Sequence, residues 1–113
     1  MMLANLGAAL TLALGMLGLI APGRAAALVK LSARTHAGRS EFRATYGGLF
    51  IGLAMVPLLT QSTLAFATVG AAWVCAALGR VVSIALDRAL SPKNWLAVGF
   101  EGGIGLLCLF PLL

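Results

Sequence analysis

Long apolar segments, separated by short polar stretches, dominate the chain. A helix needs about 20 apolar residues to cross a bilayer, because it rises about 1.5 Å per residue. The first such run extends from Leu3 to Ala21 and is stopped by Pro22 and Gly23. It is longer than the apolar part of a signal peptide, and no Lys or Arg precedes it. We therefore interpret it as a retained membrane span.

A second apolar stretch, from Ala44 to Gly79, carries no charged side chain and is too long for one crossing. Pro57 and the polar residues 60–63 mark a turn inside it. The pattern therefore predicts an all-α membrane protein, a bundle of four transmembrane helices with short loops in a single domain over residues 1–113. The predicted spans are approximately residues 3–21, 42–59, 64–86 and 95–113.

The stretch between the first two spans is the most polar part of the chain. Within it, Ala25 to Ala33 is predicted to form a short helix on the membrane surface. Ser40 is the expected N-cap of the second span, and Glu41 favours the first turn of that helix because an acid complements the helix dipole there.

Composition supports this interpretation. Hydrophobic residues make up 61% of the chain and charged residues only 10%, which is too few to cover the surface of a small soluble domain. The net charge of +5 comes from Lys and Arg placed between the apolar runs. This placement indicates contact with anionic lipid headgroups, and it argues against nucleic acid as a partner.

The distribution of basic residues predicts an orientation. Arg24, Lys30, Arg34, Arg39 and Arg43 lie in or beside the first loop, Arg88 and Lys93 lie in the third, and the second loop has none. Loops that carry an excess of Lys and Arg remain on the cytoplasmic side. Both termini are then expected outside, which is the periplasm if the membrane is the inner membrane of a bacterium.

Polar residues in and beside the predicted spans form a candidate site. Charged side chains are unfavourable in a bilayer and need partners. Spacing along the helices places Arg43, Tyr46, Arg80 and Glu101 at similar depth, near the cytoplasmic side. Ser83 and Asp87 share one helical face with Arg80. The cluster comprises Glu41, Arg43, Tyr46, Arg80, Ser83, Asp87 and Glu101. Glu101 is expected to pair with Arg80 or, failing that, with Arg43. Either the pair fixes the register of the helices, or the cluster forms a small pocket that binds a ligand or relays protons.

Glycines at helical spacing are the second feature. Small residues let helix backbones approach closely in lipid. The candidate packing residues are Gly48, Gly52, Gly79, Gly99 and Gly103. Packing within the chain is the simpler interpretation, and formation of a homodimer or docking onto a larger membrane complex is the alternative.

Other reactive residues do not form a recognisable motif. His36 has no cysteine or carboxylate cluster near it in the sequence, so we expect no metal site. Cys75 and Cys108 lie in apolar runs and are interpreted as small core residues. The chain has no catalytic fingerprint, and we expect no cofactor.

Several of these polar residues recur in an ordered pattern. The run from Glu41 to Leu53 reads EFRATYGGLFIGL, and it is followed by Gly79-Arg80, Ser83, Asp87 and Glu101. This pattern resembles the small bacterial four-span proteins of the domain-of-unknown-function family 4345, over nearly the whole chain. The resemblance implies a four-helix inner-membrane fold and no particular activity. Arg88 departs from it, because the family usually has glycine there.

Three classes of function remain open at this stage. The preferred hypothesis is a structural or accessory module that binds other membrane proteins or lipids. The second is a small, dimeric transporter or channel that uses a Glu/Arg site inside the membrane. A membrane-embedded enzyme is the third, with Tyr46, Asp87 or Glu101 as acid or base, and no catalytic motif supports it.

Overall fold

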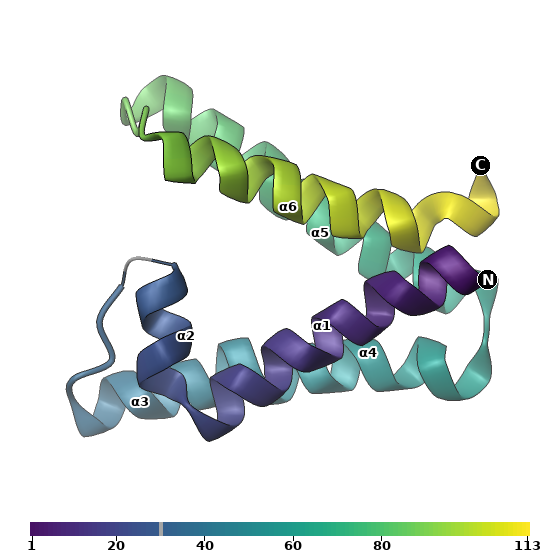
Figure 1. Cartoon of the computed structure of the whole chain (residues 1–113), viewed down its shortest axis with the longest axis horizontal. Coiled ribbons are helices and arrows are strands. Elements are labelled where there is room, and N and C mark those ends of the chain that lie inside the picture. The colour runs from purple at the N-terminus through teal and green to yellow at the C-terminus, as the bar shows by residue number, and fades with distance from the viewer. Residues whose placement is uncertain (30) are drawn as a thin grey trace.

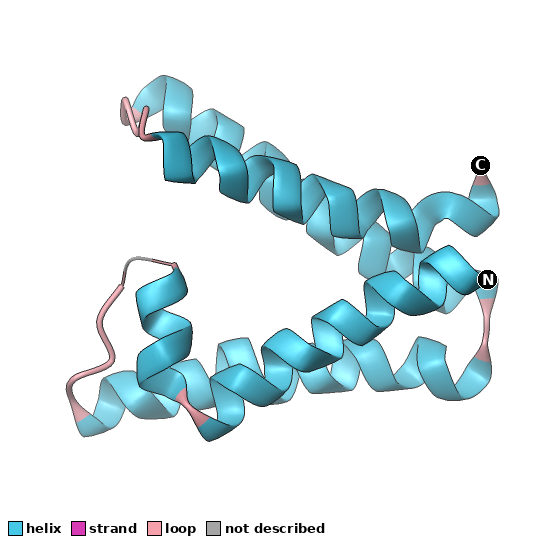
Figure 2. Ribbon diagram, in the orientation of Figure 1, coloured by secondary structure: helices cyan, strands magenta, loops and turns pink. Residues whose placement is uncertain are grey.

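Helices account for nearly all of the computed structural model, which describes residues 1–29 and 31–113. No strand occurs among these residues (Figure 2). The helices and turns are α1 (Met2–Ile20), α2 (Pro22–Leu28), α3 (His36–Phe42), the π-helical segment η1 (Arg43–Gly48), α4 (Leu49–Thr60), α5 (Thr63–Leu86), α6 (Pro92–Leu109) and the 3-10 turn η2 (Phe110–Leu112).

The predicted all-α architecture with four long apolar helices is confirmed. α3, η1 and α4 form one continuous helix from His36 to Thr60, and α6 continues into η2. With α1 and α5 these make four helices that are long and apolar enough to cross a membrane.

The second long helix begins earlier than the sequence suggested. The Thr35 side chain accepts a hydrogen bond of 2.8 Å from the backbone N–H of Gly38 and caps the helix at His36. The predicted N-cap at Ser40 is therefore wrong, and Ser40 and Glu41 lie inside α3. The Thr35 hydroxyl satisfies one of the free N–H groups of the first turn, so the helix starts here and not at Ser40.

The short helix after the first span also differs from the expected one. α2 runs from Pro22 to Leu28, whereas the prediction was Ala25 to Ala33. Pro22 occupies the first helical position, where its missing N–H has no intrahelical partner to lose. Lys30, one of the basic residues of the predicted loop, lies outside the described residues.

The long helices form two antiparallel pairs that diverge like the arms of a V (Figure 1). One arm consists of α1 with α3–α4, and the other consists of α5 with α6. The arms meet at the end that holds both termini and the α4–α5 turn, and they separate toward the opposite end, where α2 stands. The molecule measures 37 × 32 × 16 Å, so the V is thin in its third dimension.

Small residues hold the helices together, and they are different glycines from those predicted. A Cβ on Gly7 would lie 2.6 Å from the Cys108 sulfur, where α1 meets α6. One on Gly70 would lie 2.8 Å from the Gly105 carbonyl oxygen, where α5 meets α6. A Cβ on Gly47 would lie 2.8 Å from the Leu19 backbone nitrogen. At Gly47 and Gly70 the clash would be with backbone atoms, so only glycine fits without a shift of the backbone, whereas at Gly7 the nearest atom is the Cys108 side-chain sulfur.

The predicted packing glycines do not make such approaches. A Cβ on Gly52, Gly79, Gly99 or Gly103 would meet nothing within 4 Å, and one on Gly48 would meet only the Arg43 carbonyl at 3.9 Å. The preferred interpretation of packing within the chain is therefore wrong for these residues. The GxxxG spacing occurs on several faces of these glycine-rich helices, and spacing alone does not identify the face that meets a neighbour.

Candidate functional site

A cleft of about 1270 Å³ lies between the arms of the V. Both arms and α2 contribute to its walls. Its size exceeds the range of about 300–1,000 Å³ that is usual for small-molecule pockets. The two arms that wall the cleft meet at a narrow end, where the termini lie, and diverge toward the opposite end (Figure 1). We refer to this narrow end as the apex and to the opposite end as the mouth.

A hydrogen bond joins the two arms near the apex. The Trp73 indole Nε1 donates to the Thr11 hydroxyl over 2.9 Å, and this hydroxyl donates to the Gly7 carbonyl over 2.9 Å. Thr11 is fully buried and Trp73 is 8% exposed. The Phe50 ring meets the Trp73 ring edge-on at a centroid distance of 5.3 Å. The cleft therefore ends in an aromatic floor whose polar atoms are satisfied.

The walls nearer the mouth are apolar and exposed. On the α2 side, Leu28 is 68% exposed and Leu31 is 56% exposed. On α6, Trp95 is 51%, Leu96 is 72% and Phe100 is 50% exposed. All five residues line the cleft. Apolar side chains of this size, exposed on both walls, suit contact with apolar groups, as do the other exposed apolar residues of these membrane-capable helices.

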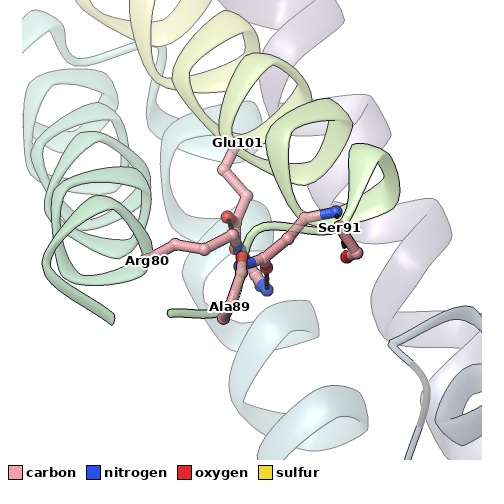
Figure 3. Close-up of polar contacts among 5 residues, drawn as sticks. Arg80, Ala89, Ser91 and Glu101 are labelled. Carbon is pink, nitrogen blue, oxygen red and sulfur yellow. Dashed lines mark hydrogen bonds and ion pairs between the residues drawn. The ribbon is translucent and has the colours of Figure 1, made fainter. Parts of the chain in front are cut away.

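The charged residues of the cleft are Arg80, Glu101 and Lys93. Arg80 reaches from α5 to Glu101 on α6 (Figure 3). Its Nε lies 2.6 Å from Glu101 Oε1 and its terminal nitrogen lies 3.1 Å from Oε2, which makes the pair bidentate. The other terminal nitrogen donates to Asn94 Oδ1 over 2.9 Å. Between the two predicted partners of Glu101, the structure selects Arg80.

Asn94 ties this pair to the loop before α6. Its amide nitrogen donates to the Ala89 carbonyl over 2.8 Å, and its backbone N–H donates to the Ser91 hydroxyl over 3.2 Å. Ser91 caps α6 in this way, and Pro92 starts the helix. The loop and the ion pair therefore form one network within the α5–α6 arm.

The remaining members of the predicted cluster lie apart from this network. Ser83 donates to Asp87 Oδ2 over 2.7 Å at the end of α5. Thr45 donates to Glu41 Oε1 over 2.9 Å on the outside of the second long helix. Arg43 donates to the Leu19 carbonyl and links that helix to the end of α1.

Tyr46 is the one further member of the cluster that lines the cleft. Its ring stacks on Phe42 at 4.7 Å and contacts the Phe50 ring at 5.9 Å. The structure therefore brings together Tyr46, Arg80 and Glu101 around the cleft. Glu41, Arg43, Ser83 and Asp87 do not line the cleft and make separate contacts elsewhere.

Sequence reasoning missed the residues that join the elements. A hydroxyl and an indole in the middle of two apolar spans, Thr11 and Trp73, are a signal for a hydrogen bond between helices. At the apex, Asn5 and Gln61 exchange two amide hydrogen bonds of 3.1 and 2.8 Å between the start of α1 and the end of α4. Both residues lie at span ends, where a polar amide gives no indication of its partner.

Among residues 1–29 and 31–113, no group of three or more His, Cys, Asp or Glu side chains is placed to hold a metal ion. Cys108 is buried, as expected, whereas Cys75 is exposed, so the interpretation of Cys75 as a core residue is wrong; both are free thiols. The chemical groups that line the cleft are apolar side chains, aromatic rings and the three charged side chains named above.

The family model for "Domain of unknown function (DUF4345)" matches residues 2–112. The chain belongs to this family. The ordered motifs from Glu41 to Glu101 predicted this membership. No curated protein and no solved structure matches the chain.

At Arg88, where the resemblance to DUF4345 led us to expect glycine, the backbone has a conformation that favours glycine. Arg88 has a φ of 54°, in the left-handed region that favours glycine. The glycine that the resemblance led us to expect at this position would adopt that conformation without strain.

Proposed function

We propose that this DUF4345 protein is an accessory protein of the bacterial inner membrane, and that the cleft between its two arms binds one membrane lipid. The observation that carries the proposal is the cleft itself. Its walls come from helices that can span a membrane, and they expose large apolar side chains from α2 and α6. Water against such walls is unfavourable, whereas a lipid chain satisfies them.

The shape of the molecule supports a lipid as the occupant. The V is only 16 Å thick, so a cleft between its arms lies close to both flat faces and is reachable from the surrounding bilayer. A chain that enters it would reach the aromatic floor at Trp73 and Phe50. A polar cargo would have no comparable partners in this deep part of the cleft.

The orientation follows from the basic loops. Arg24 and Arg34 lie on the stretch between α1 and the second long helix, and Arg88 and Lys93 lie between α5 and α6. These segments lie at the mouth end of the V (Figure 1). By the positive-inside rule, the mouth faces the cytoplasmic leaflet and both termini face the periplasm.

The ion pair supports an accessory role more than coupled transport. Glu101 forms two bonds with Arg80 on the neighbouring helix of the same arm. A carboxylate held in this way fixes the register of α5 against α6. A proton-coupled transporter would instead need a carboxylate that changes partners during its cycle.

The experiment uses the fact that the chain has two tryptophans and both line the cleft. In Trp95→Phe, the remaining Trp73 reports on the apex alone. The protein is reconstituted into vesicles that contain lipids with brominated acyl chains, which quench indole fluorescence on contact. A lipid in the cleft is expected to quench Trp73.

A blocking variant and a matched control make the test specific. Ala76 lines the cleft one helical turn from Trp73, so Ala76→Phe is expected to reduce the quenching at least twofold. Ala71 is also exposed on α5 but does not line the cleft, so Ala71→Phe is expected to leave the quenching unchanged. Absence of quenching in the parent, or equal effects of the two variants, would overturn the proposal.

A further inference from the structure

We infer that the lipid in the cleft is an anionic phospholipid, and that the Lys93 ammonium at the mouth binds its phosphate. This inference rests on the proposed function and adds the chemical class of the ligand. Lys93 lies in the first turn of α6, lines the cleft and is exposed. Within residues 1–29 and 31–113 its side chain has no ion-pair or hydrogen-bond partner.

The charges around the cleft leave Lys93 uncompensated. Arg80 and Glu101 neutralise each other through the bidentate pair, so the net charge of the cleft walls is that of Lys93. The nearest other acids in the sequence, Asp87 and Glu41, do not line the cleft, and each accepts a hydrogen bond from a neighbour on its own helix. A ligand with net negative charge complements such a site.

The position of Lys93 along α6 fits a headgroup better than a chain. Trp95 follows it by two residues and marks the depth at which aromatic residues meet headgroups. Leu96 and Phe100 line the cleft beyond, deeper along the same helix. A lipid with its chains against these residues would bring its phosphate to the first turn of α6 and its chain ends toward Trp73.

We assign an anionic and not a zwitterionic phospholipid because like charges repel. A zwitterionic headgroup carries a cationic amine that would meet Lys93 and the other basic residues of the mouth. A phosphatidylglycerol headgroup has only the negative phosphate. One Lys or Arg near an anionic surface contributes about 1 kcal/mol, which corresponds to an affinity ratio of about fivefold.

The test holds the membrane constant and changes only the lipid that carries bromine. Vesicles contain equal amounts of phosphatidylglycerol and phosphatidylcholine throughout, so the surface potential is fixed. The brominated chains are placed on one lipid or on the other, and Trp73 quenching is measured in the Trp95→Phe protein. We expect brominated phosphatidylglycerol to occupy the cleft about fivefold more strongly.

The variants test the role of Lys93. Lys93→Gln is expected to bring the ratio close to one, and Lys93→Arg is expected to keep it. Arg88 lies on the loop that precedes α6 but does not line the cleft, so Arg88→Gln serves as the matched control with an unchanged ratio. An effect of Arg88→Gln equal to that of Lys93→Gln would show a general surface charge effect and overturn the inference.

The outcomes separate the inference from the proposed function. Equal quenching by both lipids in the parent would leave a lipid-binding cleft and overturn the anionic assignment. No quenching by either lipid would overturn both. A particle with the mass of two chains in which Trp73 is shielded from both lipids would assign the cleft to a second copy of the protein, and this also overturns both.

Discussion

Replacement of Thr11 by Val tests whether the hydrogen bond at the apex holds the two arms together. Val has nearly the same shape as Thr and lacks the hydroxyl. The substitution removes the acceptor of the Trp73 indole N–H, which bonds to Thr11 over 2.9 Å. Thr11 is fully buried and Trp73 is 8% exposed, so neither water nor a lipid headgroup can replace the lost acceptor.

The magnitude follows from the environment of the bond. A buried donor left without an acceptor destabilises a protein by about 1–3 kcal/mol. Hydrogen bonds between helices in membranes contribute less, about 0.6 kcal/mol on average and at most about 1.7, because the unfolded helices also find partners. We therefore expect Thr11→Val to lower the free energy of unfolding by about 1–2 kcal/mol, near the upper end of the membrane range.

The assay is equilibrium unfolding in mixtures of mild detergent and dodecyl sulfate, followed by far-ultraviolet circular dichroism. Thr68→Val is the matched control, because the Thr68 hydroxyl is exposed and bonds only to the Leu64 carbonyl of its own helix over 2.9 Å. Its effect should stay within about 0.5 kcal/mol. A double-mutant cycle of Thr11→Val with Trp73→Phe should give a coupling energy of about 1 kcal/mol. A coupling near zero, or equal effects of the two threonine variants, would refute the reasoning.

Three further predictions concern the backbone. Gly47→Ala should destabilise the protein by about 1–3 kcal/mol, because the new Cβ would lie 2.8 Å from the Leu19 nitrogen. Gly52→Ala should be neutral or stabilising by up to about 1 kcal/mol, since its Cβ meets nothing within 4 Å and Ala is the better helix former. Both are measured by the same unfolding assay, and a larger loss for Gly52 would contradict the packing described above. Arg88→Gly should stabilise the protein by about 1 kcal/mol relative to Arg88→Ala, since the φ of 54° is strained only when a Cβ is present. Equal melting temperatures of these two variants would contradict it.

The predicted polar cluster was assembled from the depth of each residue in the membrane, counted along its helix, and this criterion identified the site only in part. The similar depth of Arg80 and Glu101 correctly predicted that they pair. Each charged side chain inside a span needs a partner, and the spans contain few other charged residues. Depth did not separate Tyr46, which lines the cleft, from Arg43, which faces the end of α1. Depth gives the position along a helix, whereas the direction in which a residue points depends on how the helices are rotated.

The sequence by itself determined the number of long helices, their approximate ends and the family. These depend on local quantities, because the length of an apolar run is compared with the thickness of a bilayer and loops are recognised by Pro and charge. Only the tertiary structure decided that the helices pair into two diverging arms with a cleft between them. It also decided that Gly47 and Gly70 are packing residues and that Gly52 and Gly103 are not. The physical reason is that a helix in lipid is apolar all round, so hydrophobic periodicity does not mark its buried face and close packing between distant residues selects it.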